Sequence, residues 1–349
     1  MMPRLHPFGA LILIAGLSCS SPAEPPAGGP NPTDPPGRWT AGPDLPVPTH
    51  KFGAAVYRGD LYLVGGAEDP GFPGAEVDGL PTDRVVRFRA ASGTWEVLSP
   101  FPEVRQSPSL AVIGDTLYAA GGFVGNGFAQ RIARETLHRY DPATDTWEAR
   151  ADMPGPRYHA ATTVAGGELY LIGGQTGSLL SAFDAVVYSP GLDAWRTIPG
   201  PPLDRAGAKA VTIAGRIYLV GGHSATSTAN LFPTIEVLDP GTGQWLPAGA
   251  MPTPRSGTGV AVLDGQIHVI GGVNLNNRYS TVHEAYDPVS STWTTFEPLP
   301  AGTERANLGV AVVGGALYAV GGFGTGLVHS GTVQRFVPDA PLLIQTGSR

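Results

Sequence analysis

Residues 257–272 read GTGVAVLDGQIHVIGG, and this stretch decides the fold of the chain. Small and β-branched residues fill its first half, the turn Asp264-Gly265 interrupts it, and a second apolar run ends at Gly271-Gly272. Two such runs around an Asp-Gly turn are typical of a β-hairpin. Tyr286 and Trp293, seven residues apart, mark a third and a fourth strand joined by a short turn. We therefore expect a unit of four antiparallel strands.

The same unit recurs along the chain. A glycine pair ends the second strand of each copy: Gly65-Gly66, Gly121-Gly122, Gly173-Gly174, Gly221-Gly222, Gly271-Gly272 and Gly321-Gly322. A tryptophan marks each fourth strand: Trp39, Trp95, Trp147, Trp195, Trp245 and Trp293. These are all six tryptophans of the chain, and a proline follows each one after seven residues. So regular a register predicts a repeat architecture in which each unit packs against its neighbours.

A glycine pair, a tyrosine three residues before it (His268 in the fifth copy) and a spaced tryptophan together resemble the Kelch motif, over about Arg38 to Pro338. The resemblance implies an all-β chain folded as a six-bladed β-propeller of Kelch repeats. In such a fold, glycines let the backbones of neighbouring blades approach, while aromatic side chains fill the space between wedge-shaped sheets. We expect these motif residues to define the fold, and we give them no catalytic role.

The two ends of the repeat region are each incomplete. Trp39 has the spacing of a fourth strand but no first three strands before it, and Leu343 stands where the last repeat should have its tryptophan. We expect an N-terminal strand carrying Trp39 to complete the C-terminal blade, because closure removes exposed sheet edges. The alternative is that residues Leu342 to Ile344 fill this slot.

The N-terminus is typical of an export signal. A short basic start precedes an apolar run that is too short to span a bilayer, which needs about 20 residues. Cys19, the only cysteine, follows Leu17-Ser18 in a pattern that resembles a bacterial lipobox, although Gly16 replaces the usual leucine. The resemblance implies lipidation of Cys19 as the mature N-terminus. Ordinary signal cleavage beside an incidental cysteine is the alternative.

These features predict an exported lipoprotein of the bacterial cell envelope, periplasmic or surface-exposed, attached to the membrane by its lipid alone. The segment after Cys19 is rich in proline and glycine and is expected to form a tether. We divide the chain into signal peptide, tether, propeller and C-terminal tail at residues 1–18, 19–37, 38–338 and 339–349.

Composition narrows the possible partners. The formal net charge is −7, and the sequence has no run of basic residues of the kind that binds along a phosphate backbone, so we expect no nucleic-acid partner. No zinc-ligand spacing, nucleophile elbow or phosphate loop occurs, so the sequence predicts no metal and no cofactor. Lys51 and Lys209 are the only lysines among 22 basic residues. We expect a monomer with a protein, peptide or carbohydrate ligand.

Arginine recurs sixteen residues before the first glycine of a pair, at Arg105, Arg157, Arg205, Arg255 and Arg305, with Thr49 in the remaining repeat. Loop lengths vary only between strands 2 and 3 and between repeats, and these connections meet at one end of a propeller. The guanidinium groups either hydrogen-bond loop carbonyls there or ring the channel mouth and accept an anionic ligand. Further candidates on this face are Glu304, His223 and the aromatic residues Phe72, Phe123, Phe128, Tyr158, Tyr279 and Phe323.

We predict a non-enzymatic binding or interaction module for an acidic sugar or peptide. The alternative is a sugar mutarotase or epimerase that resembles a periplasmic sialic-acid mutarotase and uses Glu304, His159 or His223 as acid or base. Galactose oxidase is another Kelch propeller, but its copper cofactor needs a cysteine joined to a tyrosine. This chain has no cysteine after Cys19, which excludes that activity.

Overall fold

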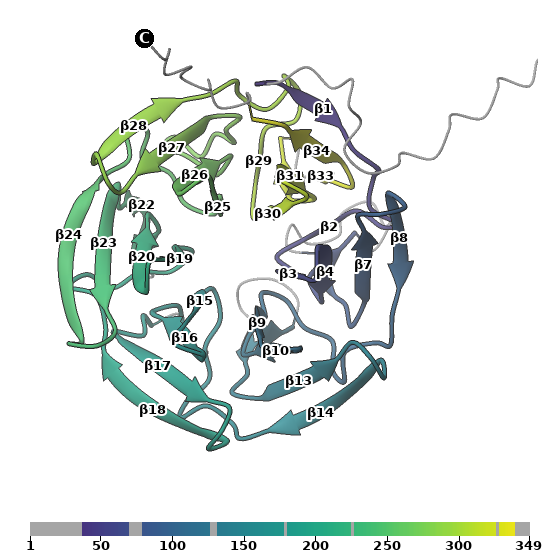
Figure 1. Ribbon diagram of the computed structural model, residues 1–349, viewed down its shortest axis with the longest axis vertical. Coiled ribbons are helices and arrows are strands. Elements are labelled where there is room, and N and C mark those ends of the chain that lie inside the picture. Colours follow the sequence, from purple (N-terminus) through teal and green to yellow (C-terminus); the bar gives the residue numbers. More distant parts are fainter. Residues whose placement is uncertain are drawn as a thin grey trace, which may run out of the picture.

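The computed structural model describes residues 37–69, 79–125, 131–177, 180–224, 227–325 and 328–338. The regular elements in these ranges are all strands, and the larger ones form six four-stranded antiparallel sheets arranged in a ring (Figure 1). The prediction of an all-β propeller is confirmed. The proposed signal peptide, Cys19, the tether up to residue 36, the C-terminal tail, Phe72 and Phe128 lie outside the described residues.

Each sheet is a blade whose first strand lies nearest the axis (Figure 1). From the axis outwards, the first blade is β3 (Gly53–Tyr57), β4 (Asp60–Val64), β7 (Val85–Arg89) and β8 (Thr94–Val97), and the second is β9 (Ser109–Ile113), β10 (Thr116–Ala120), β13 (Leu137–Asp141) and β14 (Thr146–Arg150). The third is β15 (Ala161–Ala165), β16 (Glu168–Ile172), β17 (Asp184–Ser189) and β18 (Ala194–Pro199), and the fourth is β19 (Lys209–Ile213), β20 (Arg216–Val220), β23 (Thr234–Asp239) and β24 (Gln244–Ala250). The fifth is β25 (Gly259–Leu263), β26 (Gln266–Ile270), β27 (His283–Asp287) and β28 (Thr292–Thr295), and the last is β30 (Gly309–Val313), β31 (Ala316–Val320), β34 (Val333–Phe336) and β1 (Trp39–Ala41).

The glycine pairs sit where one blade meets the next. Gly173 and Gly174 have φ angles of 62° and 91°, a conformation that glycine adopts without strain. A Cβ on Gly173 would lie 2.5 Å from the carbonyl oxygen of Arg205 in the following blade, and the Gly174 N–H donates to that same oxygen at 2.7 Å. Glycine is therefore required by conformation and by close backbone approach.

The tryptophans join adjacent blades through their ring nitrogens. Trp195 Nε1 donates to the carbonyl of Ala151, just after the last strand of the preceding blade, at 2.7 Å. Four other tryptophans make the equivalent bond, to the carbonyl oxygens of Glu297 (Trp39), Pro43 (Trp95), Ser99 (Trp147) and Pro199 (Trp245). Apolar clusters fill the space between neighbouring blades, as where Tyr170 of β16 packs with Leu219 of β20. The motif residues have the structural role predicted for them.

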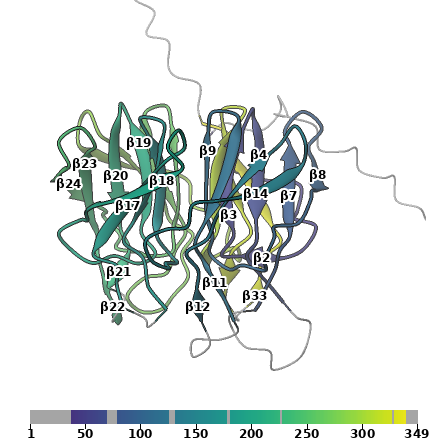
Figure 2. The same ribbon diagram turned by 90° about the horizontal axis from the view of Figure 1, so that it is seen from below.

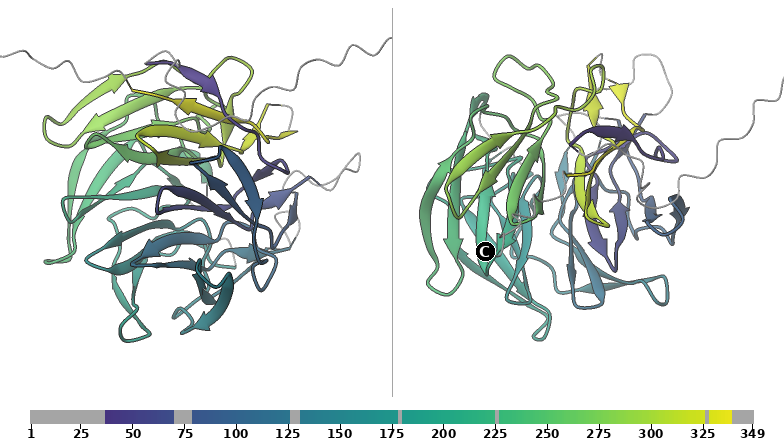
Figure 3. Two further views of the ribbon diagram at one scale, coloured as in Figure 1. Left: turned by 45° about the vertical axis from the view of Figure 1, so that its right-hand side comes forward. Right: turned by 45° about the horizontal axis from the view of Figure 1, so that its top comes forward.

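The ring is closed by the N-terminal strand, as predicted. Strand β1 pairs with β34 in the register Trp39 with Phe336, and both views in Figure 3 place the two strands side by side. The ring of Trp39 lies 5.3 Å from that of Phe336 and is only 8% exposed. The hydrogen bond from Gly42 N–H to Val333 O, at 2.8 Å, continues this pairing beyond β1.

The connections predicted to share one end of the propeller do so. The short strands and their partners lie together at the lower edge of Figure 2. In each repeat, the residue after the arginine position pairs with the residue after the glycine pair, as Gln106 does with Phe123. The short strands are β2 (Thr49–His50), β5 (Ala67–Glu68), β6 (Leu80–Pro81), β11 (Phe123–Val124), β12 (Ile132–Ala133), β21 (His223–Ser224), β22 (Ser227–Leu231), β29 (Arg305–Ala306), β32 (Phe323–Gly324) and β33 (Val328–His329). Within the described ranges, no helix has the length and apolarity needed to cross a membrane.

Candidate functional site

A collar of six residues, one from each repeat, surrounds the axis of the propeller. Each lies two positions after the arginine position, and all have φ angles between 52° and 63°: Lys51, Ser107, His159, Gly207, Gly257 and Asn307. The left-handed conformation turns the chain from the loop into the innermost strand. Backbone hydrogen bonds link the collar from blade to blade, as from Ser107 N–H to Lys51 O at 2.6 Å and from Asn307 N–H to Gly257 O at 2.7 Å.

The collar also closes across the junction of the chain ends, where Lys51 N–H donates to Asn307 O at 3.2 Å. Because these backbone groups bond to one another, ligand recognition in the channel depends largely on side chains. Two consecutive collar positions, Gly207 and Gly257, have no side chain. One side of the collar is therefore open, and polar side chains occupy the other.

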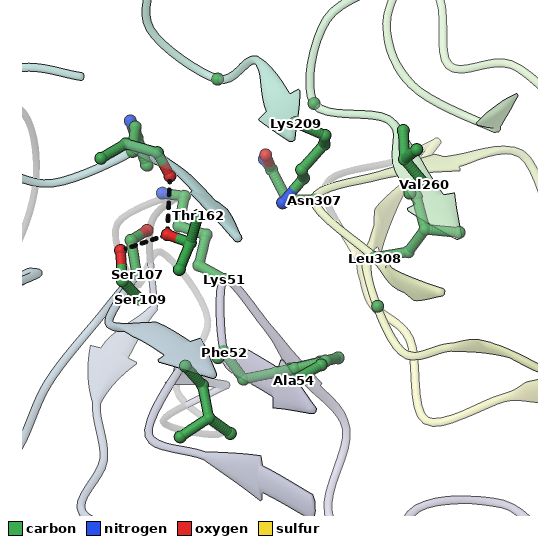
Figure 4. A pocket seen from close by; sticks show the side chains of 18 of the residues that line it. Lys51, Phe52, Ala54, Ser107, Ser109, Thr162, Lys209, Val260, Asn307 and Leu308 are labelled. Atoms are coloured by element: carbon green, nitrogen blue, oxygen red, sulfur yellow. Dashed lines mark hydrogen bonds between the residues drawn. The ribbon is translucent and has the colours of Figure 1, made fainter. Parts of the chain in front are cut away.

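The collar borders a cavity of about 240 Å³ that also includes the start of the innermost strand of several blades (Figure 4). Its polar side chains are those of Lys51, Ser107, Ser109, His159, Thr162, Lys209 and Asn307. Among the lining residues that the structure describes, none is aspartate or glutamate. The cavity therefore has a positive electrostatic character although the whole chain is acidic.

Lys209 contributes its amino group from the first position of β19, next to the open side of the collar (Figure 4). Burial lowers the pKa of its ammonium group. Its side chain and that of Asn307 both project into the cavity. Because no carboxylate in the cavity wall offsets the desolvation of the ammonium group, an anion there would be stabilised.

Lys51 and His159 belong to a second group at the cavity edge. The Lys51 ammonium lies 5.8 Å from the centre of the Phe123 ring, and the Arg131 guanidinium lies 5.0 Å from it. The rings of Tyr158 and His159 are 5.0 Å apart. Burial, and then the charges of Lys51 and Arg131, hold the pKa of His159 well below its usual range. His159 is therefore a neutral imidazole at pH 7 beside two cations.

The structure corrects the hypothesis of an exposed arginine ring. The five repeated arginines are at most 5% exposed, and none of them lines the channel cavity. Their side chains point back into the blades and donate to main-chain carbonyls, four of them to the first glycine of their own pair: Gly121 (Arg105), Gly173 (Arg157), Gly221 (Arg205) and Gly271 (Arg255). Arg305 donates instead to the carbonyls of Ala319 and Thr332.

Carboxylates compensate the charge of four of these arginines. Glu103, Asp184, Glu236 and Glu284 pair with Arg105, Arg157, Arg205 and Arg255. Burial lowers the pKa of each guanidinium, but arginine stays charged, so the paired carboxylates offset part of the cost of burying that charge. The interpretation in which arginine hydrogen-bonds loop carbonyls is the one that the geometry supports.

The other predicted candidates are dispersed over this face. The His223 ring borders the open side of the collar, since a Cβ on Gly207 would lie 3.1 Å from its Cε1. Glu304 lies beside a separate depression formed with Val328 and His329 and does not line the channel cavity. Tyr158, Phe123 and Phe323 are buried in the loop layer, which leaves their faces unavailable for stacking on a ligand.

Lys51, Lys209, Asn307 and the cavity hydroxyls were missed in the sequence. The collar position could have been found as a fixed offset from the arginine, but its occupants vary between lysine, serine, histidine, asparagine and glycine. The available signal was the restriction of lysine to Lys51 and Lys209. In the described part of the chain, no group of three or more histidine, cysteine or acidic side chains is placed to hold a metal ion.

Fold and site together define a Kelch-repeat β-propeller, and the chain belongs to this family. Residues 110–322 match the family model described as the KLHDC2/KLHL20/DRC7 Kelch-repeats domain. A Kelch propeller is consistent with a binding or interaction module.

Individual relatives are similar in sequence to only part of this chain. Kelch-like protein 35 of Mus musculus is 30% identical over 137 residues, 39% of this chain and 21% of the relative. Kelch-like protein terF of Aspergillus terreus is 34% identical over 137 residues, 39% of this chain and 28% of the relative. Beta-scruin of Limulus polyphemus is 30% identical over 139 residues, 40% and 14% of the two chains. The match therefore spans less than a third of each of these relatives.

Among solved structures, the one titled "Structure of YjhT" superposes with a TM-score of 0.72 at 18% identity, covering 86% of this chain and 98% of that chain. At this identity the likeness concerns the fold. It supports one propeller domain over nearly all of the described residues.

Proposed function

We propose that this protein is an envelope-tethered binding module that takes an anionic ligand, an acidic sugar or an acidic peptide, at the collar of its channel. The observation that carries the proposal is the charge of the cavity: Lys51 and Lys209 line it, and none of its described lining residues is acidic. Two cations in a partly enclosed site attract a carboxylate more strongly than they would in bulk water.

The remaining lining supports recognition of a polar ligand. Thr162 Oγ1 donates to Ser109 Oγ at 2.7 Å, which orients two hydroxyl groups at the cavity wall (Figure 4). Asn307 adds an amide next to Gly257, and the collar has no side chain at Gly207 and Gly257. A ligand with hydroxyl or amide groups around a carboxylate matches this arrangement. The buried arginines contribute by fixing the loops that carry the collar.

Charge removal at the collar tests the proposal. We expect calorimetry to detect binding of an acidic sugar such as glucuronate, no binding of glucose, and weakening by salt. The double variant Lys51→Met/Lys209→Met should abolish binding with little change in melting temperature. Arg58→Met is the matched control, because Arg58 is exposed, pairs with Asp115 and lies in the turn between β3 and β4. Equal binding of both sugars, or unchanged binding by the double variant, would contradict the proposal.

The tether depends on Cys19, and its test is separate. Cys19→Ser should move the protein from the membrane to the soluble fraction, because acyl chains alone hold it. A mature N-terminus without lipid, found by mass spectrometry, would support ordinary signal cleavage instead.

Sugar mutarotation is a second candidate, which the position of His159 favours. This imidazole lines the cavity and is neutral at pH 7, so it is available as a general base. NMR exchange spectroscopy on acidic sugars should then show faster anomer interconversion with the wild type than with His159→Gln. Equal rates with and without protein would leave binding as the function.

A further inference from the structure

The two lysines of this chain occupy one cavity. Of the 22 basic residues, all others are arginine, yet Lys51 and Lys209 both line the channel. Either residue would supply a positive charge. The chemical difference is that a lysine amine loses its proton and becomes a nucleophile, whereas arginine stays protonated. The restriction of lysine to the channel therefore suggests that an amine is needed there.

Of the two, Lys209 has the environment of a reactive amine. It is half-buried at the start of β19, and its neighbours in the cavity are Gly207, Ala208 and Ala210, which offer no carboxylate to stabilise an ammonium group. Burial accordingly lowers its pKa, which raises the fraction of free amine at neutral pH. Lys51 differs, because its ammonium lies beside the Phe123 ring at the edge of the cavity.

We propose that Lys209 captures a carbonyl group covalently, forming a reversible Schiff base with an aldehyde or keto group of an anionic ligand. The ligand class is a carboxylate that also carries a carbonyl, such as an oxo acid or the open-chain form of an acidic sugar. The carboxylate part of this inference rests on the proposed function, while the covalent part depends on Lys209 alone.

The step balances without an oxidant or reductant. The neutral Lys209 Nζ attacks the carbonyl carbon, the C=O π electrons move to oxygen, and the proton leaving nitrogen reaches that oxygen to give a carbinolamine. Loss of the second N–H proton together with hydroxide releases one water and forms the C=N bond. Asn307 projects into the same cavity and can donate its amide to the carbinolamine oxygen (Figure 4). Lys51 would balance the charge of the ligand carboxylate.

Reductive trapping tests this on the full mature protein. Glyoxylate, which has an aldehyde and a carboxylate, is the probe, and sodium cyanoborohydride fixes any imine as a stable amine. Because the chain has only two lysines, peptide mass spectrometry assigns each adduct. We expect Lys209 to be labelled faster than Lys51 at neutral pH, because burial lowers the pKa of the Lys209 amine and leaves more of it unprotonated. Lys209→Arg should lose the adduct and keep the charge, while Lys51→Arg should retain it.

The outcomes separate the covalent step from anion binding. Equal labelling of both lysines, or labelling of Lys209 only after denaturation, would overturn the proposal. Propionaldehyde, which has no charge, is the second probe. If it labels Lys209 as fast as glyoxylate does, the reactive amine is supported and the anion preference is refuted. If glyoxylate fails to label Lys209 while calorimetry still shows acidic-sugar binding, the Schiff base is refuted and the proposed function stands.

Discussion

The junctions between blades are of two kinds, and the difference lies in one side chain. At the junction held by Arg205, the arginine carbonyl accepts from Gly174 N–H at 2.7 Å and its guanidinium reaches Gly221 O at 2.8 Å. Where the chain ends meet, Thr49 keeps the first contact, with Gly322 N–H at 3.0 Å, but its hydroxyl turns to Val47 O at 2.9 Å. The backbone contact is thus present at both junctions, and the guanidinium contact only at the first.

At the Thr49 junction, the hydroxyl bonds within its own loop instead, and the outer strand of the last blade is β1. At the other junctions, the arginine side chain bonds the loop that leads into a blade to a carbonyl of that same blade, and an unbroken chain joins the loop to the blade. The last blade has no such continuous connection, because its outer strand comes from the other end of the chain. Its cohesion therefore depends on the pairing of β1 with β34 and on the packing of Trp39 against Phe336. Five junctions are therefore each held by one buried arginine, which we call a distributed anchor. The closure is held by strand β1 with its buried Trp39, which we call the concentrated anchor.

Removing that concentrated anchor should have the largest effect. A mature protein that starts at Pro43 lacks β1, exposes the edge of β34 and loses Trp39. Burial of about 150–250 Å² of this side chain at about 25 cal/mol per Å² stabilises the fold by at most ~4–6 kcal/mol, comparable to the whole stability of many domains. We expect unfolding or aggregation, measured by circular dichroism and light scattering.

The matched control deletes Ser20 to Asp34, which precede the described residues and leave β1 intact, and we expect no change in melting temperature. A monomeric truncation at Pro43 that melts like the full domain would mean that Leu342 to Ile344 fill the slot of β1.

A distributed anchor should matter less. Arg255→Met leaves Glu284 buried without its cation, since that carboxylate is 4% exposed and bonds to Arg255 at 2.9 Å. Breaking a buried ion pair from one side costs about 3–5 kcal/mol. Thr49→Val at the other kind of junction should cost only about 1 kcal/mol, the value of one hydrogen bond. Urea unfolding of the two variants gives the comparison.

The double variant Arg255→Met/Glu284→Met separates charge from packing. Because it removes both charges, it should recover much of the lost stability. Equal stability of Arg255→Met and wild type would show instead that the guanidinium is not an anchor.

The sequence allowed much of this comparison to be predicted. The regular spacing of the glycine pairs and tryptophans predicted the blades, and the isolated Trp39 predicted their closure. These features can be read from the sequence because close backbone approach and aromatic packing demand particular residue types. The direction of the arginine side chains could not be predicted, since the same spacing suits a guanidinium that faces the channel or the blade. The partners that decide it, Glu236 and Glu284, follow their arginines by about 30 residues on a third strand. The collar was missed because its conformation, rather than its residue type, is what repeats.

An effect that depends on pH concerns two histidines in the blade next to the closure. His268 and His283 are buried, and His268 Nδ1 lies 2.8 Å from His283 Nε2. The His283 ring is 5.4 Å from that of Trp39. Burial holds the pKa of both groups below the usual histidine value, so both are neutral in the folded protein at pH 7. Their equivalents in the other blades are a tyrosine and an apolar residue, such as Tyr170 and Ala185 in the pairing of β16 with β17.

This difference predicts that acid weakens the blade beside the closure. With a lowered pKa in the folded state, the stability due to neutral histidine is complete above about pH 6.5 and falls as the pH drops below it, because the unfolded chain then binds protons that the fold excludes. Each histidine contributes up to ~1.4 kcal/mol per pH unit, so about 1–3 kcal/mol should be lost by about pH 5.5. His268→Tyr/His283→Val gives this blade the residue types of the others and should flatten the decline in melting temperature between about pH 7 and 5.5. If wild type and double variant lose stability in parallel, carboxylates elsewhere cause the acid sensitivity, and the closure is no weaker in acid than the arginine-anchored junctions.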